Sequence, residues 1–319
     1  MSSIVANGLV KRYAGVLALD QLSFEVPRGS ICAVIGPNGC GKTTTFGLLA
    51  GLLAADAGQI DLFGEGPFDA ARHAGRVSLM PQDALPSPHA TLRQSLRYYG
   101  ELQGLERARA WREADRWLEQ VRLAERADAR QSQLSHGMRR RFSVAQALLG
   151  EPELILLDEP TAGVDPELAA ELRALFRAQS GRATLLISSH VLSELEELCD
   201  HAIVIEKGRA VRQGSMQSLL QADTLVRVTL SAPADLTRLA VQLPGARLEW
   251  QPPELRVRWS DAAPLEQLNA RLLGALLEQG VGILALYAGQ SLEASYLAER
   301  RAALGQGDGS LPRGGSSSR

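Results

Sequence analysis

The chain has 319 residues, of which 45% are hydrophobic and 22% are charged, and its formal net charge is −2. This composition is typical of globular proteins, and the length allows one large domain and a smaller second one. A net charge near zero argues against a dedicated nucleic-acid-binding protein, because such proteins use an excess of basic groups to neutralise phosphates.

The cysteines and apolar segments indicate the compartment. Cys32, Cys40 and Cys199 are odd in number and lack metal-ligand spacing, which favours a reduced, cytoplasmic chain over a disulfide framework. The first residues do not have the basic and apolar regions of a signal peptide. The longest apolar stretches, such as 154–157 and 282–288, are far shorter than the roughly 20 residues that a membrane span needs. If the protein acts at a membrane, we expect another chain to cross it.

Short apolar runs bounded by turns recur along the first part of the chain and predict strands. They are residues 31–35, 77–80, 154–157, 184–188 and 202–205. Segments with helical periodicity lie between them, at 43–53, 138–149 and 166–179. Runs without apolar–polar alternation are typical of strands buried on both faces, so we expect a mostly parallel α/β sheet. From about residue 91 to 133 the apolar residues have helical spacing, which predicts a helical subdomain of about residues 88–150.

After Gly214 the pattern changes. Strands are predicted at 224–230, 247–250, 254–259 and 283–287, and helices at 234–242 and 263–278. The resulting order, β-α-β-β-α-β, is the ferredoxin-like arrangement. We therefore expect a first domain of residues 1–220 and a small α+β domain of residues 224–300. The Gly/Ser-rich residues 305–319 cannot bury a core, and they predict a disordered tail or an addition to the native chain.

A glycine-rich motif follows the strand 31–35 and opens the next helix. Its residues are Gly36, Pro37, Asn38, Gly39, Cys40, Gly41, Lys42, Thr43 and Thr44. The glycines allow backbone N–H groups to point at phosphate oxygens, and the helix adds its positive dipole end. Lys42 is placed to reach the β- and γ-phosphates, and the Thr43 hydroxyl to bind Mg²⁺. A chance match is the alternative, which the flanking strand and helix disfavour.

The apolar run 154–157 ends in two carboxylates, Asp158 and Glu159. We expect this strand to lie beside the strand that leads into the glycine-rich motif. Asp158 would then hold Mg²⁺, and Glu159 would orient and polarise the attacking water. Taken alone, the pattern also fits a strand that ends in solvated acids.

The segment from Leu134 to Met138, which three arginines follow, resembles the signature motif of ABC ATPases. The residues that match this motif are Ser135, His136, Gly137 and Met138. It lies upstream of Asp158 and Glu159, as it does in that family. The resemblance implies a P-loop NTPase fold, specifically an ABC nucleotide-binding domain with a mixed sheet and a helical subdomain. It covers about residues 4–215, and it implies ATP hydrolysis with ATP and Mg²⁺ bound.

Other elements of the ABC family follow in the family's order. Tyr13 resembles the aromatic residue that stacks on adenine, and Gln82 resembles the glutamine that senses Mg²⁺ and the attacking water. Residues 162–165, which end in Asp165, resemble the D-loop, and His190 resembles the switch histidine that contacts the γ-phosphate. The alternatives are a half-buried strand residue for Tyr13, a loop-capping role for Gln82 and a structural histidine for His190.

Ser135 is expected to cap the helix that follows it, and a capped helix N-terminus binds anions. In the ABC family this helix end meets the γ-phosphate that the other subunit binds. The resemblance therefore implies a head-to-tail dimer, in which Ser135 and Gly137 act on the partner's ATP. We expect a homodimer.

Two residues depart from the common Leu-Ser-Gly-Gly-Gln form. His136 replaces the first glycine, and an outward-facing side chain without a role is the favoured interpretation. Met138 replaces the glutamine, and a methionine followed by arginines resembles the drug- and polymer-export branch. For Arg139, Arg140 and Arg141 a solvated helix face is favoured over contact with a membrane or partner.

Residues 224–300 resemble the accessory domain of daunorubicin-resistance-type, or ABC-2 type, exporter ATPases, including the closing segment 291–297. The resemblance implies export through a separate membrane permease, with this chain at the cytoplasmic face of the inner (plasma) membrane. An importer ATPase is the alternative for direction. A non-transport ABC ATPase acting on nucleic acid or ribosomes is the alternative for function, although no nucleic-acid partner is expected. A regulatory protein without turnover conflicts with Glu159 and His190.

Overall fold

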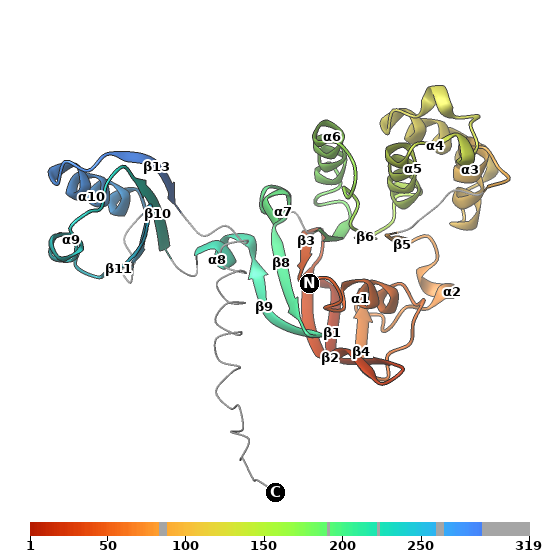
Figure 1. The fold of residues 1–319 in the computed structure, drawn as a ribbon. Helices are drawn as coiled ribbons and strands as arrows, with labels where there is room; N and C mark the ends of the chain where they lie inside the picture. The colour runs from red at the N-terminus through yellow and green to blue at the C-terminus, as the bar shows by residue number, and fades with distance from the viewer. Residues whose placement is uncertain (83–87, 190–191, 222–223, 260–264, 289–319) are drawn as a thin grey trace, which may run out of the picture. The chain divides into compact units, whose positions relative to one another are not determined.

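The computed structural model describes residues 1–82, 88–189, 192–221, 224–259 and 265–288. The chain divides into two compact units, with the boundary between Met216 and Gln217. Figure 1 labels most of the elements of both units. Among the described helices, none is long and apolar enough to cross a membrane.

A six-stranded mixed sheet forms the centre of the first unit. Its strands are β3 (Ile31–Ile35), β5 (Val77–Met80), β6 (Leu154–Asp158), β7 (Thr184–Ser188), β8 (His201–Glu206) and β9 (Arg209–Ser215). They lie in the order β5-β6-β7-β3-β8-β9, and all neighbours are parallel except the β8–β9 pair. The prediction that β6 lies beside β3 is wrong, because β7 pairs with both strands and separates them.

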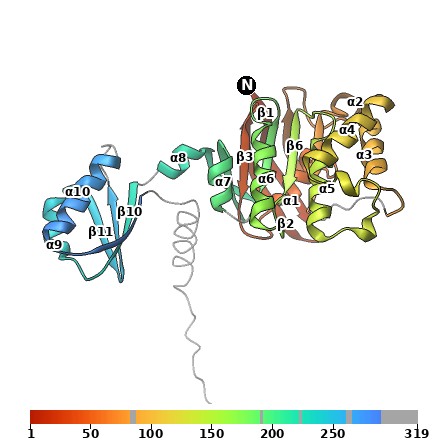
Figure 2. The same cartoon turned by 90° about the horizontal axis from the view of Figure 1, so that it is seen from above.

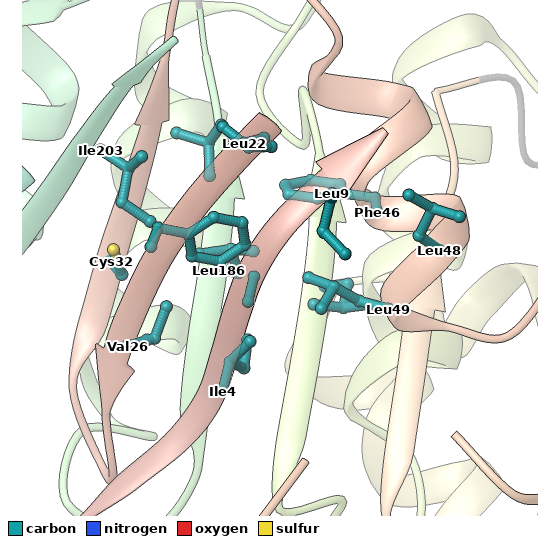
Figure 3. Packing of buried hydrophobic residues seen from close by; sticks show 14 of the residues in the cluster. Ile4, Leu9, Leu22, Val26, Cys32, Phe46, Leu48, Leu49, Leu186 and Ile203 are labelled. Carbon is teal, nitrogen blue, oxygen red and sulfur yellow. The ribbon is translucent and has the colours of Figure 1, made fainter. Parts of the chain in front are cut away.

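A three-stranded antiparallel sheet, which the sequence did not predict, covers the helix after β3. Its strands are β1 (Ser2–Tyr13), β2 (Val16–Pro27) and β4 (Ala57–Leu62), in the order β2-β1-β4. Figure 3 shows side chains of this sheet, of α1 (Lys42–Leu49) and of the central sheet in one apolar cluster. Phe46 and Leu49 of α1 pack there with Ile4 and Leu9 of β1. This burial fixes the helix that opens at the glycine-rich motif.

The remaining helices of the first unit are α2 (Ala70–His73), α3 (Leu92–Leu102), α4 (Arg107–Gln120), α5 (His136–Leu148), α6 (Pro166–Arg177), α7 (Leu192–Leu198) and α8 (Met216–Gln221), which crosses the unit boundary. They include α5 and α6, which were predicted, and α2, α7 and α8, which were not. Two 3₁₀ turns, Ala124–Arg126 and Gln131–Gln133, join α4 to α5. Figure 2 shows α3, α4 and α5 gathered at one end of the unit. These three helices lie within the predicted helical subdomain.

The second unit has the predicted β-α-β-β-α-β order. Its elements are β10 (Thr224–Leu230), α9 (Leu236–Gln242), β11 (Ala246–Gln251), β12 (Glu254–Trp259), α10 (Leu265–Glu278) and β13 (Ile283–Ala288). The strands form an antiparallel sheet in the order β11-β12-β10-β13, which confirms the ferredoxin-like prediction. Val228, Leu255 and Leu272 lie in its core. The predicted tail 305–319 and the segment 291–297 lie outside the described residues.

Candidate active site

The glycine-rich motif forms a loop between the fully buried strand β3 and helix α1. Gly39 and Gly41 have φ values of +79° and +112°, in the region that favours glycine. Gly36 has no room for a side chain, because a Cβ there would collide with the Ile205 carbonyl oxygen and would lie 2.5 Å from Cys40 Sγ. The glycines therefore allow the tight turn that the sequence predicts for this motif, the P-loop (residues 36–44).

Lys42 is the first residue of α1, and its side chain folds back over the P-loop. Its Nζ donates to the carbonyl oxygens of Gly36, at 2.8 Å, and Pro37, at 3.2 Å. The residue is only 7% exposed. Its ammonium group is therefore held against the backbone of the loop, where it adds a positive charge.

Asp158 lies at the end of β6 and joins three elements. One of its carboxylate oxygens accepts from Thr43 Oγ1 at 2.6 Å, and the other accepts from Ser188 Oγ at 2.5 Å. The Ser188 hydroxyl in turn accepts from the backbone N–H of Glu159 at 2.9 Å. The carboxylate is 2% exposed, so these hydroxyls replace the water that burial removes. The sequence alone did not predict a role for Ser188. The feature that could have indicated it is a hydroxyl residue at the end of an apolar strand.

These groups border one cavity of about 520 Å³. The residues around it are Ala18, Asn38, Gly39, Gly41, Lys42, Thr43, Thr44, Gln82, Asp158 and Glu159. The cavity thus brings together the P-loop, both carboxylates and Gln82. Ala18 of β2 was not predicted. Its carbonyl oxygen would lie 2.9 Å from a Cβ on Gly41, so β2 closes tightly over the P-loop.

Five of the predicted ATP-binding and catalytic residues are not in this set: Gly36, Pro37 and Cys40 of the P-loop, Tyr13 and His190. Tyr13 ends β1 and is 42% exposed, with Lys11 Nζ 5.7 Å from its ring centroid, and it does not line the cavity. His190 lies outside the described residues.

Gln82, which follows β5, is linked to the helical subdomain through its backbone. Arg140 Nη1 donates to the Gln82 carbonyl oxygen at 2.9 Å. Arg140 lies on α5 and is 8% exposed, so the expectation of a solvated helix face is wrong for this arginine. The helix that carries the signature motif is therefore attached to the edge of the cavity.

The signature motif forms the first turn of α5 and does not line the cavity. As expected, Ser135 caps the helix, and its Oγ accepts from the Met138 N–H at 3.2 Å. Ser135 and His136 are exposed, whereas Gly137 and Met138 are partly buried. Asp165 caps α6 and accepts from the Leu168 N–H at 2.9 Å.

Comparison with known proteins assigns the family. The sequence profile described as "ABC transporter" matches residues 19–162. The Nod factor export ATP-binding protein I of Burkholderia lata is 39% identical over 215 residues, which are 67% of this chain and 71% of that protein. The protein of the same name from Ralstonia nicotianae is 40% identical over 219 residues, 67% of each chain.

Solved structures agree. The ATP-binding subunit of an ABC transporter matches with a TM-score of 0.62 and 28% identity, over 68% of this chain and 92% of that one. A bacterial Atm1-family ABC exporter with ATP bound matches with a TM-score of 0.62 and 27% identity, over 69% of this chain and 40% of that one. Together with the P-loop and the paired carboxylates of the cavity, these similarities show that the chain belongs to the ATP-binding subunits of ABC transporters and is an ATPase.

Proposed function

We propose that this chain hydrolyses ATP with Mg²⁺ as the nucleotide-binding subunit of an ABC exporter and that it drives a separate membrane permease. One observation carries the proposal. Lys42, Thr43, Asp158 and Glu159 border a single cavity, whereas Ser135, on the signature helix, does not border it. Lys42 and Thr43 would form one part of a phosphate site inside the cavity. The signature motif would form the other part, outside the cavity of its own chain.

The P-loop would hold the phosphates of ATP through its backbone N–H groups and through Lys42, with Tyr13 stacked on the adenine. Thr43 Oγ1 and Asp158 Oδ2, 2.6 Å apart, present a hydroxyl and a carboxylate at the same point of the cavity. Mg²⁺ prefers such oxygen ligands and is commonly shared between one or two carboxylates and substrate phosphates. The donor set therefore fits Mg²⁺, with Gln82 as a further oxygen donor. The ion would supply charge neutralisation at the β- and γ-phosphates.

Glu159 is the proposed general base. Its backbone N–H donates to the Ser188 hydroxyl, and the residue borders the cavity that Gln82 also borders. A carboxylate in this place can orient and polarise a water for attack on the γ-phosphate. His190, which follows β7 in the sequence, would contact the same phosphate.

The signature motif would complete the site of a second copy. The capped N-terminus of α5 presents N–H groups and a positive dipole end, which favour an anion. Because Ser135 does not border its own chain's cavity, we assign it to the γ-phosphate held by the partner, in a head-to-tail homodimer with two ATP molecules. Binding of ATP would close this dimer, and the Arg140–Gln82 contact supports a relay from the nucleotide to the helical subdomain.

The direction of transport is proposed as export. The relatives from Burkholderia lata and Ralstonia nicotianae are named as export ATP-binding proteins. The ferredoxin-like second unit agrees with the resemblance to ABC-2 type exporter ATPases. The permease would hold this chain at the cytoplasmic face of the membrane.

A mixing experiment tests the composite site. We expect Lys42→Ala and Ser135→Arg each to reduce hydrolysis by about 100-fold or more when present in both copies. In a one-to-one mixture, half of the dimers are mixed, and each contains one site with an intact Lys42 and an intact Ser135. Activity should therefore recover to roughly one quarter of the wild-type value. S135R must still bind ATP, which shows that its own P-loop is folded. No recovery in a mixture that forms dimers contradicts the composite site.

A further inference from the structure

We propose that His136 is a positioning residue that holds the D-loop (residues 162–165) against the first turn of α5. The imidazole occupies the space beside Gly163. A Cβ built on Gly163 would lie 2.8 Å from His136 Cε1 and 3.2 Å from its Nδ1. Separations under about 3.0 Å do not occur between a real Cβ and another heavy atom, so the ring and the D-loop backbone are already in close contact.

Gly163 can accept this contact because it has no side chain and because its φ is +72°, a value that other residues rarely adopt. A second contact lies beside the first. Leu168, in the first turn of α6, is 3.9 Å from a Cβ built on Gly137. The first turn of α5 therefore meets the D-loop at one point and the first turn of α6 at another, and the imidazole is the larger group at this junction.

The D-loop is also hydrogen-bonded to the backbone of Glu159. The Ala162 N–H donates to the Glu159 carbonyl oxygen at 3.2 Å, and the Val164 N–H donates to the Thr161 carbonyl oxygen at 3.4 Å. His136, the neighbour of Ser135 in the sequence, thus packs against Gly163 of the D-loop. The D-loop in turn is hydrogen-bonded to the backbone of Glu159 through Ala162. Both His136 and Gly163 are exposed, so the contact belongs to the surface of the unit and not to its core.

The consequence for hydrolysis rests on the function proposed above. If Ser135 contacts the partner's ATP, His136 connects that contact to the loop that follows the chain's own Glu159. Loss of the ring should then lower kcat more than it raises KM for ATP, because Lys42 and the P-loop lie elsewhere. A side chain without this role would change neither quantity.

A double-mutant cycle isolates the contact. Gly163→Ala has two costs: alanine is strained at the positive φ of this position, and its Cβ collides with the imidazole. In the H136A background only the backbone strain remains. We expect the loss of kcat caused by G163A to be about tenfold smaller in the H136A background than in wild type, because contacting residues couple. KM for ATP should change by less than about twofold.

Two controls accompany the cycle. Gly181 has a φ of +77°, and a Cβ there would meet no heavy atom within 4 Å. The effect of Gly181→Ala should therefore be the same with and without H136A. His136→Phe keeps a planar ring without its nitrogens, so G163A should remain as harmful in H136F as in wild type if packing is the role. Equal G163A penalties in wild type and H136A overturn the proposal.

Two further measurements test the His136–Gly163 contact without measuring ATP hydrolysis, and the second does not require a folded G163A variant. Thermal unfolding of the four cycle variants without ATP should show non-additive shifts of Tm. In H136A alone, amide hydrogen exchange over residues 160–165 should become faster, while exchange near Gly181 stays unchanged; unaltered exchange over 160–165 contradicts the contact. If the mixture of K42A and S135R recovers no activity but His136 and Gly163 still couple in the double-mutant cycle, the contact between them is supported. Only its proposed connection to the partner's ATP is then contradicted.

Discussion

At the residue scale, Asp158 organises the candidate site. Its carboxylate is buried and accepts from two hydroxyls, Thr43 on α1 and Ser188 on β7, so both oxygens have partners. Ser188 also fixes the backbone of Glu159. A buried carboxylate without such partners is costly, and removal of either hydroxyl leaves an acceptor unsatisfied. The pair of hydroxyls therefore fixes the positions of Asp158 and of the Glu159 backbone.

The cysteines give a prediction about pH and reactivity. Burial raises the pKa values of the Cys32, Cys40 and Cys199 thiols above their ordinary range. A raised pKa leaves less thiolate at pH 8, and thiolate is the nucleophile. We expect the native protein to react with Ellman's reagent at pH 8 only slowly, and the denatured protein to release the signal of all three thiols at once. Rapid reaction of one thiol in the native protein contradicts the assigned burial.

Much of the site could be predicted at this scale, because local spacing carries it. The P-loop, Asp158 and Glu159 are recognised from their order after apolar strands, and the structure brings them together. Ser188 and Arg140 could not be assigned in this way. Their partners, Asp158 and Gln82, are distant in the sequence, so only the packed sheet and helices reveal them.

At the element scale, α3 carries a capping box that ties down the start of the helical subdomain. Thr91 Oγ1 accepts from the Gln94 N–H at 3.2 Å, and Gln94 Oε1 accepts from the Thr91 N–H at 3.0 Å. Two N–H groups that the helix cannot satisfy are thereby paired.

Thr91→Ala should weaken this helix end by about 1 kcal/mol, which is about a fivefold increase in local opening. Amide hydrogen exchange over residues 92–102 measures this effect. Thr91→Ser retains the hydroxyl and serves as the matched control, with exchange close to wild type. If T91A and T91S exchange alike at the wild-type rate, the cap does not stabilise α3.

The helices and strands also show how far the pattern of apolar residues predicts element bounds. The predicted strands at 31–35 and 77–80 have the observed bounds, because short apolar runs flanked by turns leave little choice. Helix α1 ends at Leu49, four residues before the prediction, since Gly51 turns the chain with a φ of +70°. Strands β1 and β2 were missed, and several register irregularities interrupt their pairing. Strand order, including β7 between β6 and β3, is set by packing and not by local sequence.

At the scale of the whole molecule, the chain divides into two compact units. The first is an ABC ATPase unit whose cavity is lined by the P-loop and both carboxylates, whereas the N-terminus of its signature helix does not line that cavity. The signature motif can therefore contact a bound nucleotide only if a second copy of the chain supplies that nucleotide. Dimer formation should therefore depend on ATP, and hydrolysis should reverse it.

Replacement of the general base tests this central claim most directly. In the full-length Glu159→Gln variant, ATP should bind but hydrolysis should fall by about 100-fold or more. Light scattering after gel filtration with MgATP is predicted to show a species of twice the mass of one chain. Wild type should not accumulate this species, and Lys42→Ala added to E159Q should abolish it. An E159Q variant that hydrolyses ATP at the wild-type rate, or that binds ATP and stays a monomer, contradicts the account.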